Sequence, residues 1–97
     1  MNPAVEERIH LNDLSFIRLC SENYGINKGI YNTIDAWFYS QGVTNILDRR
    51  KNILFFLDYL QRKNGESRSK QKFGNGGLTM NLREYFTGTY SKTASNF

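Results

Sequence analysis

Hydrophobic residues at three- and four-residue spacing predict helices over most of the first two thirds of the chain. Pro3, followed by Glu6 and Glu7, is typical of a short helix, because proline suits the first helical position and acids near it suit the helix dipole. Asn12 or Asp13 can cap the next helix, since a side-chain oxygen there can accept a bond from a free backbone N–H.

We expect this second helix to extend to about Asn23. A third helix is expected over residues 28–41, where Gly42 ends it. The pattern predicts a fourth, long helix over residues 46–63, and Asn64-Gly65 is a typical stop signal.

From residue 66 onward the helical spacing gives way to alternation. Residues 67–73 alternate basic with other side chains, residues 74–77 can form a turn, and residues 78–82 alternate apolar with polar side chains. The alternating basic and apolar positions are Arg68, Lys70, Lys72, Leu78, Met80 and Leu82. We therefore expect a basic β-hairpin over residues 66–86, with a disordered basic loop as the alternative. Residues 87–97 are rich in Ser, Thr and Asn and predict a flexible tail.

The stretch from Ile17 to Ala36 has the layout of two helices joined by a tight turn. Gly25 supplies a residue that tolerates positive φ in the turn, and Ser21 is small enough to let the second helix pass close to the first. The apolar positions that would hold the pair together are Tyr24, Ile26, Tyr31 and Ile34, followed by Trp37 or Phe38.

In these residues the chain resembles helix-turn-helix DNA-binding proteins as a broad class, and a basic hairpin beside them resembles the wing of winged-helix proteins. It departs from the class at Ser21, where alanine is usual, and at Tyr24 and Tyr31, which are bulkier than the usual aliphatic residues. The expected fold is mainly α: a helix-turn-helix core of three to four helices with a C-terminal wing-like hairpin. We expect one domain over residues 1–86 and a tail over residues 87–97.

The resemblance implies that the second helix of the pair docks in the major groove of DNA. The residues that would then contact base edges are Asn27, Lys28, Gly29, Asn32 and Thr33. Asp35, the first acid of this helix, should point away from DNA. Two alternatives stay open. The pair can be a packing unit without a ligand, or the helix over residues 46–63 can enter the groove instead.

Charge adds a second argument for a polyanionic partner. The net charge is +4, and residues 48–97 carry ten bases and four acids, whereas residues 1–47 carry three bases and five acids. The residues expected to contact phosphates are Arg49, Arg50, Lys51, Arg68, Lys70 and Lys72. A solvated basic surface without a partner is the alternative.

The fourth helix carries more apolar residues than one face needs, so it must be buried on more than one side. In a small chain the second side can meet another copy. We therefore expect a homodimer, with the C-terminal segment folding over this side as the alternative. The expected interface residues are Ile46, Ile53, Phe56, Leu57 and Leu60.

The sequence gives little support for an enzyme, a metal-binding protein or a membrane-spanning protein. The single cysteine, Cys20, allows no intramolecular disulfide, and the single histidine, His10, lacks a second ligand at metal-site spacing. Residues 74–77 are no phosphate loop, because no Gly-Lys-Ser/Thr follows. No signal peptide and no bilayer-length apolar run are evident. We therefore expect a cytoplasmic protein that is not an enzyme and uses no metal or cofactor.

The sequence thus predicts a double-stranded-DNA-binding protein that acts as a transcriptional regulator or as a DNA-organising or partition factor. Two alternatives belong to other classes. One is a protein-interaction module, such as a phage-encoded inhibitor, that uses its aromatic side chains as a sticky surface. The other is an RNA- or single-strand-binding protein, with base-stacking positions at Phe73, Tyr85, Phe86 and Tyr90.

Overall fold

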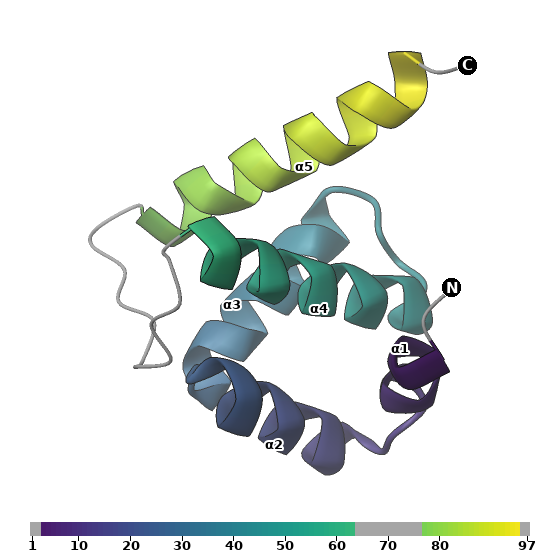
Figure 1. The fold of residues 1–97 in the computed structure, drawn as a ribbon, viewed down its shortest axis with the longest axis vertical. Helices are drawn as coiled ribbons and strands as arrows, with labels where there is room; N and C mark the ends of the chain where they lie inside the picture. Colours follow the sequence, from purple (N-terminus) through teal and green to yellow (C-terminus); the bar gives the residue numbers. More distant parts are fainter. Residues whose placement is uncertain (1–2, 64–76, 96–97) are drawn as a thin grey trace.

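The computed structural model describes residues 3–63 and 77–95, and every element within these ranges is a helix (Figure 1). In chain order the helices are α1 (Pro3–Ile9), α2 (Asp13–Tyr24), α3 (Lys28–Ser40), α4 (Ile46–Lys63) and α5 (Gly77–Ser95). The long α4 lies at the centre, and α1, α2, α3 and α5 each pack against it. The predicted bounds of the helices up to residue 63 are therefore confirmed to within about a turn.

Asparagine side chains cap three of these helices. Asn12 Oδ1 accepts from the backbone N–H of Ser15 at 2.9 Å, and Asn27 Oδ1 accepts from that of Ile30 at 2.8 Å. Asn45 Oδ1 accepts from the N–H groups of Leu47 and Asp48 at 2.9 and 3.0 Å, just inside the start of α4. Each bond satisfies a backbone donor that the helix itself leaves unpaired, and so each cap fixes where its helix begins.

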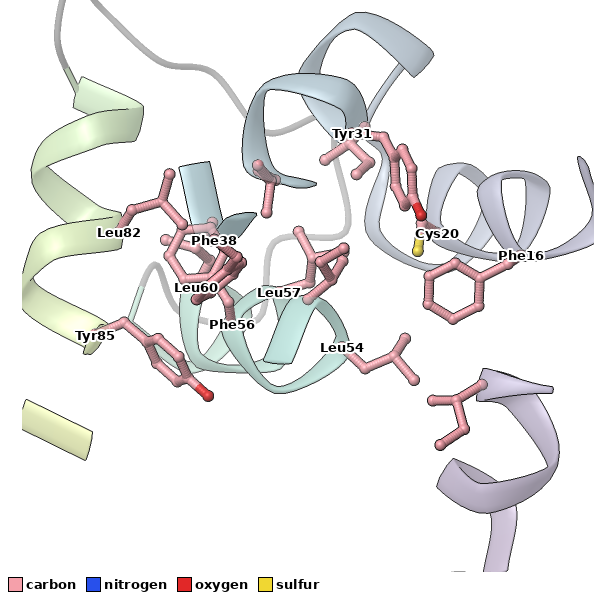
Figure 2. Close-up of a cluster of buried hydrophobic side chains, with 14 of the residues drawn as sticks. Phe16, Cys20, Tyr31, Phe38, Leu54, Phe56, Leu57, Leu60, Leu82 and Tyr85 are labelled. Carbon is pink, nitrogen blue, oxygen red and sulfur yellow. The ribbon is translucent and has the colours of Figure 1, made fainter. Parts of the chain in front are cut away.

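The hydrophobic core runs across α4 from α2 to α5 (Figure 2). Phe16, Cys20 and Tyr31 lie on one side of Leu57, and an aromatic group lies on the other side. That group contains Phe38, Phe56 and Tyr85, whose rings meet edge to face with centroids 5.6 to 6.3 Å apart. Aromatic rings favour this geometry because the positive edge of one meets the negative face of the next.

The expected homodimer interface on α4 is wrong, because its residues fill the core of a single chain. Ile53, Phe56, Leu57 and Leu60 are at most 1% exposed, and only Ile46 reaches solvent, with 46% of its surface exposed. Four helices pack against α4, so most of its surplus apolar residues are covered within the chain. The alternative, in which the C-terminal segment covers the extra face, is the arrangement observed.

The expected β-hairpin is also wrong for the residues that the structure describes, since residues 77–86 form the first half of α5. Leu78, Leu82 and Tyr85 follow helical spacing, and this stripe packs into the core, with Leu82 fully buried. Met80, which alternation would place beside them, is 69% exposed. The first arm of the hairpin, residues 66–76, lies outside the described residues. The expected boundary at residue 87 falls inside α5.

A polar cluster joins α5 to the end of α4. The Tyr59 hydroxyl and the Lys63 ammonium both donate to Glu84 Oε1, and Lys63 also donates to Asn81 Oδ1 at 2.9 Å. The bond from Lys63, followed by that from Tyr59, lowers the pKa of the Glu84 carboxyl below its usual value. The bond to Glu84 raises the pKa of Tyr59 to about 12. Both shifts favour the charge state that holds the cluster together at neutral pH.

This cluster predicts an acid-sensitive junction between α4 and α5. A carboxyl whose folded-state pKa is lowered adds stability above its unfolded pKa and loses that stability as pH falls through the folded value. We expect hydrogen-exchange protection of α5 to fall as the pH drops below the usual range of glutamate. Glu84→Gln, which keeps an acceptor oxygen but cannot titrate, should weaken this pH dependence. Equal acid sensitivity in both proteins would rule out Glu84 as its source.

Candidate nucleic-acid interface

The turn between α2 and α3 has the form that its sequence predicts. Gly25 adopts a left-handed conformation with φ of 69°, and its N–H donates to the Ser21 carbonyl at 2.9 Å. Ile26 is 2% exposed and anchors the turn in the core. Tyr31 and Ile34 hold the inner side of α3. The outer side of α3 is therefore presented to solvent by a well-anchored pair of helices.

The outer side of α3 forms a continuous exposed surface without an acidic residue. We call this surface the α3 face, and its residues are Lys28, Gly29, Asn32, Thr33, Ala36, Tyr39 and Ser40. All are exposed, and most are small, so a flat ligand can approach the helix closely. The expected base-contacting residues thus lie together, at the N-terminal end of this face and on its cap.

The side chains of the expected base-contacting residues differ in whether they already form hydrogen bonds within the chain. Asn27 uses its oxygen as the cap of α3, and the Thr33 hydroxyl donates to the Gly29 carbonyl at 2.9 Å. A Cβ at Gly29 would lie 3.2 Å from the capping oxygen, so glycine leaves room for the cap. Lys28 and Asn32 have no partner among the described residues. They are therefore the polar side chains of the α3 face most open to a ligand.

The acid nearest to the α3 face is neutralised by a buried arginine. Arg49 Nε donates to Asp35 Oδ1 at 2.7 Å, and its Nη1 donates to the carbonyls of Val43 and Thr44 at 3.3 and 2.9 Å. The guanidinium also lies over the Tyr39 ring, 5.2 Å from the ring centroid. Arg49 is only 9% exposed, so its predicted contact with a phosphate is wrong: the side chain ties the α3–α4 connection to α3.

Arg50, the next expected phosphate contact, is likewise a structural residue. It is 5% exposed, donates to the carbonyls of Ile9 and Leu11 and pairs with Asp13, and lies 4.9 Å from the centroid of Phe16. These bonds hold the connection between α1 and α2 against α4. Burial of a guanidinium requires such partners, because an unpaired buried charge is strongly disfavoured.

Replacing Arg50 should therefore destabilise the fold. Arg50→Met keeps the contact with Phe16 but leaves the Ile9 carbonyl without this donor, and we expect a loss of about 2–3 kcal/mol in the free energy of unfolding. Arg62→Met is the matched control, since Arg62 makes an exposed pair with Asp58 whose loss should change stability by less than about 1 kcal/mol. Urea denaturation of both variants measures the difference. Equal effects would contradict a structural role for Arg50.

The other expected phosphate contacts lie elsewhere. Lys51 is partly exposed on α4, 3.9 Å from Glu6, and does not belong to the α3 face. The basic residues of the segment between α4 and α5 lie outside the described residues, and their contacts with phosphates stay predictions: they are Arg68, Lys70 and Lys72.

Sequence reasoning missed Tyr39 as a member of the α3 face. Tyr39 is 57% exposed although it is a large aromatic residue. The signal was present, because Lys28, Asn32, Ala36 and Tyr39 follow one another at helical spacing on one side of α3. Tyr39 directly follows the apolar residues Trp37 and Phe38, so the sequence alone does not show which of the three aromatic residues is exposed.

Most other aromatic residues are used in the core. Tyr85 is 7% exposed, and Phe86 meets Trp37 edge to face at 5.5 Å, so neither is a free base-stacking platform as the single-strand alternative supposed. Phe73 and the side chain of Tyr90 lie outside the part of the chain that the structure describes. The sticky aromatic surface of a protein-interaction module is not seen either, because the large aromatic side chains with wide exposure in the described chain are Tyr39 and Phe55.

The described residues offer little other chemistry. Burial raises the pKa of the Cys20 thiol to about 12, which keeps it protonated and unreactive. No cluster of potential metal ligands and no helix of membrane-spanning length and hydropathy occurs within residues 3–63 and 77–95. A shallow hollow of about 480 Å³ lies between the α3–α4 connection, α4 and α5. Its lining residues are Gly42, Val43, Asp48, Lys51, Asn52, Phe55 and Tyr85.

Comparison with known proteins identifies one informative relative. The chain is 37% identical over 91 residues to the RNA-binding riboflavin kinase RibR of Bacillus subtilis (strain 168). The match covers 93% of this chain and 40% of the relative, so the chain spans well under half of that protein's length. No protein-family model matches the chain, and no solved structure matches it significantly.

This comparison corrects the function expected from sequence. The name of the relative reports RNA binding, and that finding overturns our prediction of a double-stranded-DNA-binding protein that regulates transcription or organises DNA. Membership of the helix-turn-helix class stays a prediction, since the comparisons do not test it. What the sequence did locate is a helix pair with an exposed, acid-free outer face.

Proposed function

We propose that this chain is an RNA-binding domain and that the α3 face is its principal contact surface. The observation that carries the proposal is similarity over 93% of the chain to a protein named for RNA binding. The α3 face supports it, because the surface is free of acids, and the charge of nearby Asp35 is neutralised by Arg49 at 2.7 Å. A polyanion can therefore approach this surface without meeting an uncompensated negative charge.

The residues of the α3 face have distinct roles in this proposal. Lys28 contacts a phosphate, because its ammonium is exposed and unpaired at the first position of α3, where the helix dipole also favours an anion. The Asn32 carboxamide offers a donor and an acceptor to a base edge. Gly29, Thr33 and Ala36 keep the surface between them low. The Lys28 contact sets affinity, and the Asn32 contact sets sequence preference.

An RNA ligand limits where the α3 face can bind. The major groove of an RNA helix is too deep and narrow for side chains to read, so proteins bind its shallow minor groove or its unpaired bases. A surface of small side chains suits either target.

The proposal is tested by fluorescence-anisotropy titration of the chain with random-sequence RNA and with duplex DNA of equal length, at two salt concentrations. We expect tighter binding to RNA, and weaker binding at higher salt because counterions are released when cations meet phosphates. Equal or tighter binding to duplex DNA, or no binding to RNA at low salt, would contradict it.

A further inference from the structure

We infer that Tyr39 is a base-stacking residue and that the RNA bound by the α3 face carries unpaired bases. This inference rests on the proposed function and specifies its substrate class. A single exposed aromatic residue is common on proteins, so exposure alone carries no weight. The inference rests instead on the position of Tyr39 on the α3 face and on its contact with Arg49.

Tyr39 lies one turn beyond Ala36 along the line that begins with Lys28 and Asn32. It is the aromatic member of the α3 face, and 57% of its surface is exposed. A strand that contacts Lys28 through a phosphate and Asn32 through a base edge therefore reaches the Tyr39 ring as it continues along α3. Because a π-face accepts every kind of base, stacking there adds affinity without demanding a sequence.

The Tyr39 ring is positioned by the Arg49 guanidinium, which lies 5.2 Å from its centroid. Arg49 cannot easily move, because it is bonded to Asp35 at 2.7 Å and to the Thr44 carbonyl at 2.9 Å and is itself buried. A cation beside an aromatic ring attracts it electrostatically. The ring is thus restrained before any ligand arrives, and less side-chain entropy is lost when a base stacks on it.

Stacking requires a base that is free of its own helix. Bases within a paired RNA helix are stacked on their neighbours and present only their edges, whereas bases in loops, bulges and single strands can be splayed onto a side chain. The bases of a fully paired duplex therefore cannot stack on the Tyr39 ring. The substrate class that fits Tyr39 is therefore RNA with unpaired bases next to a phosphate-contacting segment.

The test compares two RNAs in anisotropy titrations with the full chain: a hairpin with a large loop, and a fully paired duplex of the same composition. Tyr39→Phe keeps the ring, and Tyr39→Leu removes it while retaining apolar bulk. We expect Tyr39→Phe to bind the looped RNA as the wild type does, and Tyr39→Leu to bind it roughly 5- to 150-fold more weakly. Affinity for the duplex should be nearly the same in all three proteins. Circular dichroism verifies that each variant is folded.

Phe55→Leu is the matched control, because Phe55 is also an exposed aromatic residue but lies on α4, outside the α3 face. We expect it to bind both RNAs as the wild type does. Unchanged loop binding by Tyr39→Leu, equal losses on loop and duplex, or an equal loss with Phe55→Leu would overturn the inference. If the wild type binds and Lys28→Ala weakens binding while Tyr39→Leu does not, the inference alone fails. If the wild type binds no RNA, the proposed function fails with it.

Discussion

Lys28→Glu is expected to weaken RNA binding roughly 10- to 100-fold while leaving the fold at least as stable as the wild type. The loss follows from one charge-assisted contact, which is worth about 1.5–3 kcal/mol, together with the repulsion of a new carboxylate from phosphate. Stability should not fall, because Lys28 occupies the first position of α3, where an acid is favoured by the helix dipole. Anisotropy titration and urea denaturation measure the two effects separately.

Arg83→Glu is the matched control for this variant. Arg83 is exposed on α5, has no partner within the described chain, and its replacement changes the net charge by the same amount. If the α3 face is the contact surface, Arg83→Glu should weaken RNA binding much less than Lys28→Glu does. Equal losses would show that RNA responds only to the overall charge, and the α3 face would lose its assigned role.

Phe38→Ala is expected to cause the largest loss of stability, about 3–5 kcal/mol. Phe38 is fully buried and is the hub of the aromatic group: its ring lies 5.5 to 6.4 Å from the rings of Trp37, Phe56, Tyr85 and Phe86. Removing it leaves a cavity where α3, α4 and α5 meet. Such a loss is a large part of the 5–15 kcal/mol that is typical of a whole domain.

Because Phe38→Ala can abolish folding, Phe38→Leu supplies a second, milder variant. Its free energy of unfolding should lie between that of the wild type and that of Phe38→Ala. Phe55→Ala is the control, since Phe55 is 44% exposed, and we expect it to lose less than about 1.5 kcal/mol. The free energies of unfolding from urea titrations decide the matter. A Phe38→Leu variant as stable as Phe55→Leu, in which the same change is made at an exposed ring, would contradict the central place of Phe38.

The helices up to residue 63 could be predicted because their boundary signals are local. Asn12 and Asn27 cap the helices that follow them through bonds within three residues, and Gly25 ends α2 with a positive φ. Such signals act through the residues themselves and need no knowledge of the rest of the chain. For the same reason the helix pair around Gly25 could be located from the sequence alone.

The hairpin could not be excluded in this way, because Leu78 and Leu82 fit alternation and helical spacing equally well over so short a run. What decides for a helix is long-range packing: Leu82 and Tyr85 fill the core beside Phe38, and Lys63 and Tyr59 bond to Glu84. Tertiary contacts of this kind override the local preference of a segment for helix or strand, and they cannot be recognised from the sequence pattern. The interface on α4 was expected wrongly on the same grounds, because the sequence pattern could not decide whether a second copy or the C-terminal segment covers this helix.

The candidate site was predicted in part. Asn32 and Lys28 are exposed together, as helical spacing requires, but charge alone could not separate Arg49 and Arg50 from cations that are free. Their partners, Asp35 and Asp13, lie 14 and 37 residues away in the sequence, and only the fold brings them into contact. The sequence also left the choice between DNA and RNA open: an RNA-binding protein was one of the alternatives, and the name of the relative favours that alternative.

Chemical-shift mapping by NMR tests the central claim most directly, because it locates the RNA on the folded chain. Adding RNA with unpaired bases to the isotopically labelled protein should shift the backbone amides of residues 28–40 and the side-chain amide of Asn32, while α1 and the middle of α4 change little. Shifts confined to α1, α4 or α5, with α3 unchanged at saturating RNA, would contradict the assignment of RNA binding to the α3 face.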